Sequence, residues 1–452
     1  MPEVKEHEQN IERVEALIAL LHAGSVTDIR RMLDELHPSE NALLLESLPA
    51  SERESVWQLM PLERKGDVLV YLNPEVRSPL IKPMAPQELA EATKELDLDD
   101  LVDFLQELPD AVIRQVLYSF DAHRREQIKT VLAYPEDSAG GLMNVDTVSV
   151  RADITLGVVV RYLRWQKRIP DNTDSLMVID RTGRYLGVLP LIELLVKNPD
   201  LHVLDVYNSK IEGIPASMPA NEVAKLFEHR DFVSAPVIDE YGRLLGRITV
   251  DDVVDVIREG VDHSFMSMAG LSETSDVFAP ALTSSRRRAI WLGVNLLTAF
   301  LAAWVIGLFD ATIEKLVVLA VLMPVVASMG GIAGSQTLTL VIRGIALGQV
   351  GDSNARRLLA KELAVGAVNG VVWALVVAAI VIAWFDDVML GGVIGTAILV
   401  NLMCAAFAGV IIPLVLQRMD IDPALAGGVI LTTVTDVIGF LTFLGLAALL
   451  LV

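Results

Sequence analysis

The C-terminal third of this chain is a series of apolar segments, each long enough to cross a lipid bilayer. Crossing the hydrocarbon core takes about 20 apolar residues in a helix. A bilayer offers no water to unpaired backbone groups, so segments that cross it in this way must be helical. The pattern therefore predicts five transmembrane helices, at residues 289–309, 316–342, 358–385, 392–416 and 424–450.

Asp436 lies in the last of these segments, where four threonines are the only other polar residues in the apolar run from Ala424 to Val452. A carboxylate at membrane depth costs at least about 2.5 kcal/mol, and it usually faces a bundle interior or a water-filled path. An anion in such a path is what a cation transporter needs. The alternative is a protonated or hydrogen-bonded Asp that packs two helices together.

Charge divides the chain into two parts. Residues 286–452 hold nine acidic and nine basic residues, which leaves 49 acidic and 28 basic residues for residues 1–285. The net charge of −21 therefore belongs to the N-terminal part, which argues against nucleic acid as a partner. Eight of the nine basic residues near the spans (286–288, 343, 356, 357, 361 and 418) fall on one side of the predicted bundle, and Lys315 alone falls on the other. The positive-inside rule then predicts a multi-pass protein of the cell (inner or plasma) membrane, with a cytoplasmic N-terminus and an extracytoplasmic C-terminus.

Residues 1–130 have the pattern of short amphipathic helices whose ends are marked by Leu-Pro pairs. A weak repeat relates residues 45–49, followed by Arg53, to residues 105–109, followed by Arg114. The repeat predicts a small helical superhelix.

Between residues 137 and 257 a β-β-α unit occurs twice, at an offset of 59 residues, and resembles a tandem pair of CBS modules. Such modules are usually regulatory sensors. In the second copy, Thr249 and Asp252 stand where CBS modules often hold a nucleotide ribose, so ATP or another adenine nucleotide is a candidate ligand. The alternative is a helix N-terminus capped by Thr249 or Asp251.

Aspartates gather at helical spacing in two places in the acidic part of the chain. Like charges repel at these spacings, and a bound divalent cation would relieve the repulsion. Mg²⁺ prefers carboxylate oxygens and keeps much of its water, so loose acidic clusters suit it. The alternative is a solvated acidic surface. The two groups are Asp99, Asp100 and Asp103, and Asp251, Asp252 and Asp255.

Three glycine pairs at a spacing of four residues predict close contacts between membrane helices. They are 330 with 334, 366 with 370, and 391 with 395. Pro324 and the glycines that follow it can expose backbone carbonyls within the membrane, but only where these line a cavity or are buried in protein. Asn369 and Asn401 are interpreted as hydrogen-bonding groups between helices, and Asp422 is placed at the cytoplasmic end of the last span.

Over nearly its full length the chain resembles the MgtE family of magnesium channels and transporters. The motifs that carry the resemblance are residues 137–143, 249–257, 324–336, 422–424 and 435–439. The resemblance implies a multidomain membrane protein. Its parts are an all-α superhelical N-terminal domain (1–135), an α/β tandem CBS pair (136–260), a linker or plug helix (261–285) and a five-helix α transmembrane domain (286–452).

The resemblance also implies a homodimer that passes Mg²⁺ through a pore and closes when cytosolic Mg²⁺ binds the N-terminal and CBS domains. The residues that it implies for the pore are Asp436, Asp422, Gly331 and Gln336. The residues that it implies for regulatory ions are Asp99, Asp100, Asp103, Asp251, Asp252, Asp255, Glu259 and Asp262.

The chain departs from the family pattern in two places, one of which comprises two residues. Ile332 stands where the family usually has Asn, which bears on ion selectivity. His263 and Ser264 stand where the plug helix usually carries a Glu-Asp pair, which bears on inhibition by cytosolic Mg²⁺.

Two other classes of function remain open from the sequence. One is a CBS-regulated transporter of another divalent cation, such as Co²⁺ or Mn²⁺, or of another solute. The other is a membrane-anchored nucleotide sensor. An enzyme is not expected, because the sequence has no nucleophile–base pair and no zinc-ligand spacing.

Overall fold

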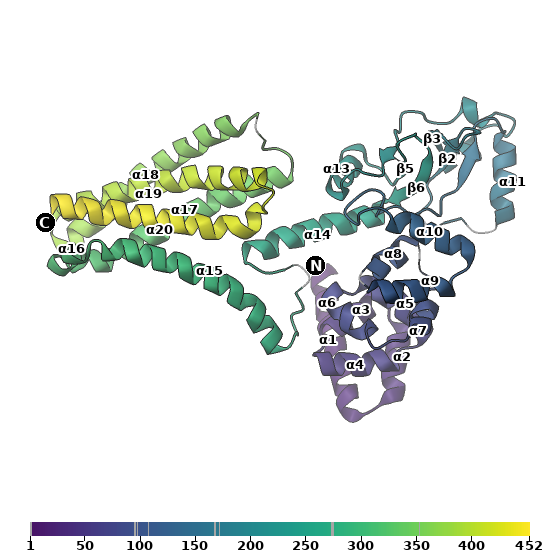
Figure 1. Ribbon diagram of the computed structural model, residues 1–452, viewed down its shortest axis with the longest axis horizontal. Coiled ribbons are helices and arrows are strands. Elements are labelled where there is room, and N and C mark those ends of the chain that lie inside the picture. The colour runs from purple at the N-terminus through teal and green to yellow at the C-terminus, as the bar shows by residue number, and fades with distance from the viewer. Residues whose placement is uncertain are drawn as a thin grey trace. The chain divides into compact units, whose positions relative to one another are not determined.

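The computed structural model describes residues 2–94, 96, 98–106, 108–166, 169–170, 172–272, 275–351 and 353–452, apart from the side chains of residues 2–9, 99, 110 and 111. The chain divides into two compact units, which are labelled by element in Figure 1. Unit 1 comprises residues 1–261 and 274–280, and unit 2 comprises residues 262–273 and 281–452.

Unit 1 begins with a succession of short helices, which confirms the predicted all-α domain. Proline sets several of the helix starts: Pro49, Pro61 and Pro109 stand directly before α4, α5 and α9. The fixed φ of proline suits the beginning of a helix. The helices are α1 (Pro2–Ala23), α2 (Val26–Glu35), α3 (Pro38–Glu46), α4 (Ala50–Leu59), α5 (Leu62–Tyr71), α6 (Pro74–Ile81), α7 (Pro86–Ala92), α8 (Leu98–Gln106), α9 (Asp110–Ser119) and α10 (Ala122–Leu132).

Arginines join successive helices of this domain in a repeated way. The Nε atom of Arg53 donates to the carbonyl of Leu45, eight residues earlier, at 2.9 Å. Arg125 donates in the same way to Leu117 at 2.9 Å. Each arginine thus satisfies carbonyls at the C-terminal end of the preceding helix, which have no partner within that helix. The weak sequence repeat pairs Arg53 with Arg114, but Arg114 is exposed, so Arg125 is the structural equivalent.

Two three-stranded sheets follow, as predicted from the duplicated β-β-α unit. The first has the order β1-β2-β3 and the second β4-β5-β6, each with one parallel and one antiparallel pair. Their elements are β1 (Ser149–Arg151), α11 (Leu156–Gln166), β2 (Ser175–Ile179), β3 (Tyr185–Pro190), α12 (Leu191–Val196), a 3-10 turn η1 (Val203–Asp205), β4 (Ile214–Pro215), α13 (Ala220–Arg230), β5 (Ser234–Ile238) and β6 (Leu244–Thr249).

The two sheets agree in register at the predicted offset. Leu176 pairs with Leu189 in the first sheet, and Ala235 pairs with Ile248 in the second, so both partners move by 59 residues. The turns agree as well, since Gly183 and Gly242 both have positive φ, at 82° and 77°. Glycine adopts this conformation without the penalty that a side chain would bring.

The helix after the second sheet, α14 (Val250–Met268), differs from the prediction of a short helix at 251–257 followed by a separate plug helix within 261–285. It is one continuous helix. Gly260 alone does not interrupt it, because a single glycine weakens a helix without ending it. Gly270, with φ of 68°, lies just beyond its end, and a left-handed glycine there terminates a helix.

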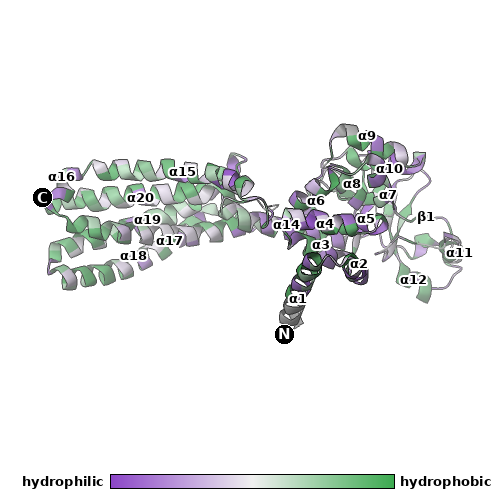
Figure 2. Ribbon diagram, turned by 90° about the horizontal axis from the view of Figure 1, so that it is seen from below, coloured by the Kyte–Doolittle hydropathy of each residue, from purple (hydrophilic) through white to green (hydrophobic). Residues whose placement is uncertain are grey.

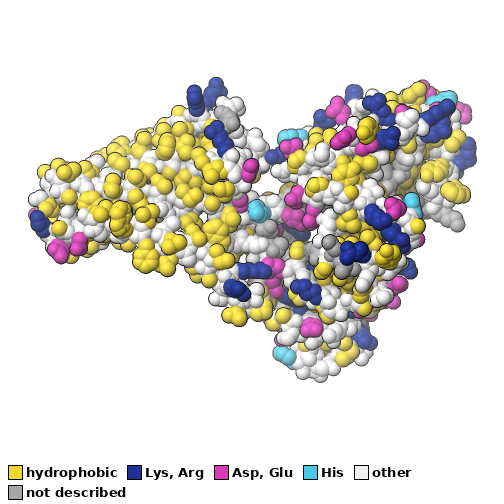
Figure 3. Space-filling model, viewed as in Figure 1, with side chains coloured by type: hydrophobic (Ala, Val, Ile, Leu, Met, Phe, Trp, Pro, Cys, Tyr) yellow, Lys and Arg dark blue, Asp and Glu magenta, His cyan; other side chains and the backbone are white. Residues whose placement is uncertain are grey.

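Unit 2 contains the five predicted membrane helices, each long and apolar enough to span a bilayer. They are α15 (Ala281–Gly307), α17 (Val318–Ala346), α18 (Ala355–Phe385), α19 (Val388–Arg418) and α20 (Pro423–Leu450), with the short α16 (Asp310–Lys315) between the first two. The long helices lie side by side, as Figure 2 shows, and α19 packs on α17, α18 and α20. Apolar side chains cover most of the face of unit 2 that is visible in Figure 3.

The glycine pairs lie where helices approach closely, as predicted. A methyl group on Gly330 would come within 2.3 Å of Asn401 Nδ2, and one on Gly366 within 2.8 Å of the Ala406 side chain. Asn401 is fully buried, and its amide donates to the Val326 carbonyl at 2.9 Å. Asn401 therefore joins α19 to α17, which agrees with its predicted packing role.

Candidate functional site

Asp436 lies in the middle of α20, which packs against α15, α17 and α19. The side chain is half-buried, and its neighbour Thr435 is fully buried. Within the described part of the chain, no hydrogen bond or ion pair reaches the Asp436 carboxylate. The carboxylate is therefore not held by a packing partner in the single chain, and it is available to a ligand.

Asp422, which was grouped with Asp436 as a pore residue, occupies a different place. It caps the start of α20, where its Oδ1 accepts from the backbone N–H of Ala424 at 2.9 Å. At 1.5 Å per residue, the 14 residues between the two aspartates place them about 21 Å apart along the helix. They therefore cannot ligate one ion together.

A contact within unit 2 joins His263, one of the two departures from the family pattern at the plug helix, to this cap. His263 Nε2 lies 3.2 Å from Asp422 Oδ2, with both side chains partly exposed. His263 stands where the family usually has an acid. The imidazole contacts the Asp422 carboxylate directly, whereas an acidic side chain at this position would need a cation between the two carboxylates. Ser264 follows it on the same helix, and the carboxylate of Asp262 is exposed there.

Three positions of interest lie on α17, and two of them, Ile332 and Gln336, are four residues apart and therefore share one face of the helix. A methyl group on Gly331 would have no other atom within 4 Å, so packing within the single chain does not require glycine at this position. Gln336 is exposed and lines a cavity shared with α18. Ile332, which replaces the usual Asn, is 57% exposed.

In unit 1, Asp103 on α8 is the most perturbed of the predicted regulatory residues. Its burial, followed by the nearby carboxylates of Glu136 and Asp252, raises its pKa to about 7. Glu259 acts in the same direction, and the guanidinium of Arg77 opposes them. The structure therefore brings acids from α8, from the segment after α10 and from α14 close enough to interact.

Acidic residues of α8 and α14 also lie near Tyr71. Its burial, together with the charges of Asp100 and Asp255, raises the pKa of the phenol. The aspartates of α8 and α14, which are far apart in sequence, thus face a common region. The side chain of Asp99 lies outside the described residues.

The other acids of α14 have local partners. Asp252 Oδ2 accepts from the Thr249 hydroxyl at 2.9 Å and from the Thr249 N–H at 3.1 Å. Asp251 accepts from the Asn172 side chain at 2.7 Å. Asp255 lies 3.6 Å from Arg258. Thr249 and Asp252 are therefore hydrogen-bonded to each other at the start of the helix, whereas the capping alternative named Thr249 or Asp251 as the cap. The nucleotide site remains a prediction.

Sequence reasoning missed Glu136, Tyr71 and Arg77. Glu136 directly precedes the motif at 137–143 that was singled out, and its backbone lies 2.6 Å from the place a methyl group on Gly141 would take. That adjacency was the available signal. Tyr71 and Arg77 carry no sequence signal, because their role depends on the packing of α5 and α6.

No three Asp, Glu, His or Cys side chains converge tightly enough to hold a metal ion among the residues that the structure describes. The acids of unit 1 are instead loosely spaced. Such spacing suits Mg²⁺, which usually keeps several waters and takes one or two carboxylates.

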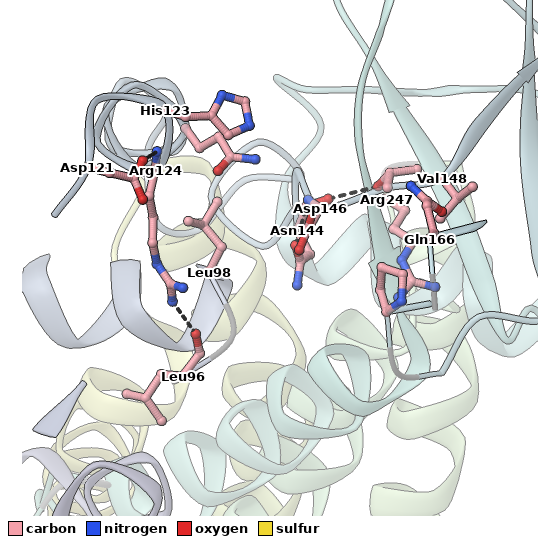
Figure 4. Close-up of a pocket in the computed structure, with 13 residues that line it drawn as sticks. Leu96, Leu98, Asp121, His123, Arg124, Asn144, Asp146, Val148, Gln166 and Arg247 are labelled. Atoms are coloured by element: carbon pink, nitrogen blue, oxygen red, sulfur yellow. Dashed lines mark hydrogen bonds between the residues drawn. The ribbon is translucent and has the colours of Figure 1, made fainter. Parts of the chain in front are cut away.

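A polar cavity of about 450 Å³ lies in unit 1 (Figure 4). His123 and Arg124 of α10 line one side, and Asn144, Gln166 and Arg247 the other. Arg124 donates to the Leu96 carbonyl at its edge. Neither Thr249 nor Asp252 lines this cavity.

Three family models match the chain. One, described as a divalent cation transporter, covers residues 323–446. The second, described as the MgtE intracellular N domain, covers residues 36–137, and the third, a CBS domain, covers residues 203–259.

Curated relatives cover nearly the whole chain. The magnesium transporter MgtE of Thermus thermophilus is 32% identical over 436 residues, which are 95% of this chain and 97% of that protein. The magnesium transporter MgtE of Bacillus subtilis is 28% identical over 431 residues, 95% of this chain and 96% of that protein. The crystal structure of the cytosolic domain of the Mg²⁺ channel MgtE in complex with ATP is 35% identical, with a TM-score of 0.49, and covers 54% of this chain and 99% of that one.

Proposed function

Because the chain belongs to the MgtE family, we propose that it transports Mg²⁺ across the membrane through a pore in which Asp436 holds the ion. The observation that carries this proposal is the half-buried Asp436 carboxylate in the middle of a membrane helix, with no partner in the described part of the chain. An ionisable group at that depth is costly and marks an ion path by default. Relatives named as magnesium transporters favour Mg²⁺ over Co²⁺, Mn²⁺ or another solute.

A single carboxylate suits an ion that stays hydrated. Mg²⁺ gives up its waters reluctantly and is commonly bound through one or two carboxylates. Asp436 would then attract the ion by charge and accept hydrogen bonds from its water shell. Binding of this kind is weak enough for the ion to leave, which conduction requires.

The working form is a homodimer in the bilayer. Gln336, Asn369 and Thr432 lie on membrane helices but are exposed in the single chain. Polar groups in membrane helices usually face a bundle interior or a water-filled cavity. A second copy, related by the two-fold symmetry that most oligomers adopt, would cover this surface and enclose a path.

The orientation follows from the basic residues in the first turns of α15, in the last turn of α17, in the first turns of α18 and at the end of α19. Such residues gather on the cytoplasmic side. We therefore propose that unit 1 lies in the cytoplasm, where the loosely spaced acids around Asp103 would bind Mg²⁺ when its concentration rises and close the pore. The adenine nucleotide remains a candidate ligand of the CBS pair.

The test replaces Asp436 by Asn, which keeps the shape of the side chain and removes its charge. We expect Mg²⁺ flux into liposomes that contain the purified protein to fall at least about tenfold, since the loss of the carboxylate charge removes an interaction of charge-assisted strength. Asp310→Asn, outside the apolar part of the helices, is the matched control and should keep its flux. Flux at the parent rate in Asp436→Asn, at equal protein content, would refute the pore assignment.

A further inference from the structure

A cavity of about 270 Å³ opens between α17, α18 and α19 in unit 2. Its polar lining comes from Gln336 and Thr337 on α17 and from Lys361, Glu362 and Asn369 on α18. Leucine and alanine side chains of α19 close its apolar side. Of the polar residues, Gln336 alone belongs to the predicted ion sites.

Glu362 is the unusual member of this lining. It is 4% exposed and lies within a helix that is long and apolar enough to span the membrane. Its Oε2 accepts from the Thr337 hydroxyl at 3.4 Å, and its Oε1 lies 2.5 Å from Lys361 Nζ. A buried carboxylate needs a counter-charge, and Lys361 is the one cation within 4 Å of it among the described residues.

Lys361 provides that charge in an unusual way. Adjacent residues on a helix do not face each other, so its side chain must fold back to reach Glu362. The lysine side chain is 59% exposed while the glutamate side chain is 5% exposed. A flexible, largely hydrated ammonium at the mouth of a cavity is a counter-ion that another cation can displace.

The cavity has the size and the donors for a hydrated divalent cation. The six waters of octahedral Mg²⁺ take roughly 180 Å³ at about 30 Å³ each. Thr337, Gln336 and Asn369 line the same cavity as Glu362, and the neutral oxygens of such side chains accept hydrogen bonds from bound water.

We propose that Glu362 is a second binding site for the hydrated divalent cation on its path, and that Lys361 is a tethered counter-ion which occupies the carboxylate until the cation arrives. When the ion enters, the ammonium moves out to solvent and the carboxylate keeps a positive partner throughout. The inference rests on the proposed transport function and adds a site and an exchange step to it.

Neutralising Glu362 and neutralising Lys361 should shift the half-saturating Mg²⁺ concentration in opposite directions. In flux measurements on the full-length protein in liposomes, Glu362→Gln should raise the half-saturating Mg²⁺ concentration at least fivefold. Lys361→Gln should lower it at least twofold, because the ion no longer competes with the ammonium. Arg357→Gln, one turn earlier on α18, removes a similar surface charge without touching the carboxylate and should change the value less than 1.5-fold.

A merely structural ion pair predicts a different result. Both substitutions would then weaken the protein and shift half-saturation in one direction, or leave it unchanged, and either outcome overturns the site. Glu362→Asp, which retains the charge, should recover at least part of the parent value, and failure to do so counts against the site as well.

A second readout separates this inference from the transport function. Stabilisation of the full-length protein in detergent by MgCl₂, relative to NaCl of equal ionic strength, needs no transport. Glu362→Gln should lose part of that stabilisation and Lys361→Gln should gain. Parent flux that is lost in Asp436→Asn but unchanged in Glu362→Gln would overturn the second site and leave the proposed function standing.

Discussion

The carboxyl group of Asp103 changes its charge near neutral pH, because burial and the carboxylates of Glu136 and Asp252 raise its pKa from 3.8 to about 7. An acid whose pKa is higher in the folded state binds its proton more tightly there than in the unfolded chain. The stability that this proton contributes is fully present below about pH 4. It is lost as the pH rises through 7.

The same group predicts that protons and Mg²⁺ compete in unit 1. At pH 6, one unit below its pKa, about a tenth of the Asp103 carboxyls are ionised, so the apparent Mg²⁺ affinity of this region should be about tenfold weaker than at pH 8. Calorimetric Mg²⁺ titration at the two pH values measures the ratio. Asp103→Asn should bind Mg²⁺ weakly and similarly at both, and an unchanged pH dependence in that variant would assign the effect to another group.

His263 and Asp422 make the second prediction at the scale of residues. The histidine lies 3.2 Å from the carboxylate, where a family acid would need a bridging cation. His263→Glu with Ser264→Asp restores two acids beside Asp422, and like charges this close favour the state in which a divalent ion binds between them. Since a ligand shifts a gate by its differential affinity for the two states, inhibition should move to lower Mg²⁺, by roughly fivefold or more.

This prediction is measured by titrating Mg²⁺ on the unit 1 side of the membrane and recording flux. His263→Gln with Ser264→Asn changes the same positions without adding charge and is the matched control. If the acidic pair leaves the inhibition curve where the parent has it, the plug-helix acids do not set closure in this protein.

At the scale of elements, the segment before α15 is attached to the helical domain by a buried ion pair. Arg53 contacts both carboxylate oxygens of Asp276, at 2.9 and 3.1 Å, while it also binds the carbonyls of Leu45 and Leu48. The two side chains are 4% and 8% exposed. The N–H of Asp276 donates to Glu75 at 2.9 Å, so both the backbone and the side chain of this segment are held.

Removing one partner of a buried pair leaves the other charge uncompensated, so Arg53→Met should lower the free energy of unfolding by about 3–5 kcal/mol. Urea unfolding of a fragment of residues 1–280 checks this value. Arg31→Met breaks an exposed pair with Asp28 and should cost less than about 1 kcal/mol. The double variant Arg53→Met with Asp276→Leu should recover part of the lost stability. If Arg53→Met alone costs as little as Arg31→Met, the segment is not held by this pair.

At the scale of the whole molecule, the separation of charge is the main feature. Residues 1–285 hold 49 acids against 28 bases, whereas residues 286–452 are neutral overall. Net charge of this size opposes compactness through self-repulsion. Bound divalent ions would relieve it more than screening by monovalent salt does.

Mg²⁺ should therefore protect unit 1 in the full-length protein against limited proteolysis. In a few millimolar MgCl₂ we expect cleavage within residues 1–261 to slow at least about threefold relative to NaCl of matched ionic strength, because bound ions stabilise the state that holds them. Equal protection by the two salts would reduce the effect to general screening.

Local pattern was enough to predict much of this protein. Five apolar runs specified five membrane helices, since a bilayer permits few other backbone structures. The 59-residue repeat predicted two β-β-α units, and the structure places their equivalent residues in the same register, Leu176 with Leu189 and Ala235 with Ile248. The isolation of Asp436 within an apolar run was also visible without coordinates, because depth in a membrane follows from position along a helix.

Contacts between elements needed the tertiary structure. The approach of Glu136 to Asp103, of His263 to Asp422 and of Thr337 to Glu362 joins residues separated by 25 to 159 positions. Asp422 and Asp436 are far apart because α20 is one continuous helix. The helix α14 is also continuous, because Gly260 weakens it without ending it. Sequence order specifies which groups a helix carries, but the packing of helices decides which of those groups meet, and charge interactions depend on that distance.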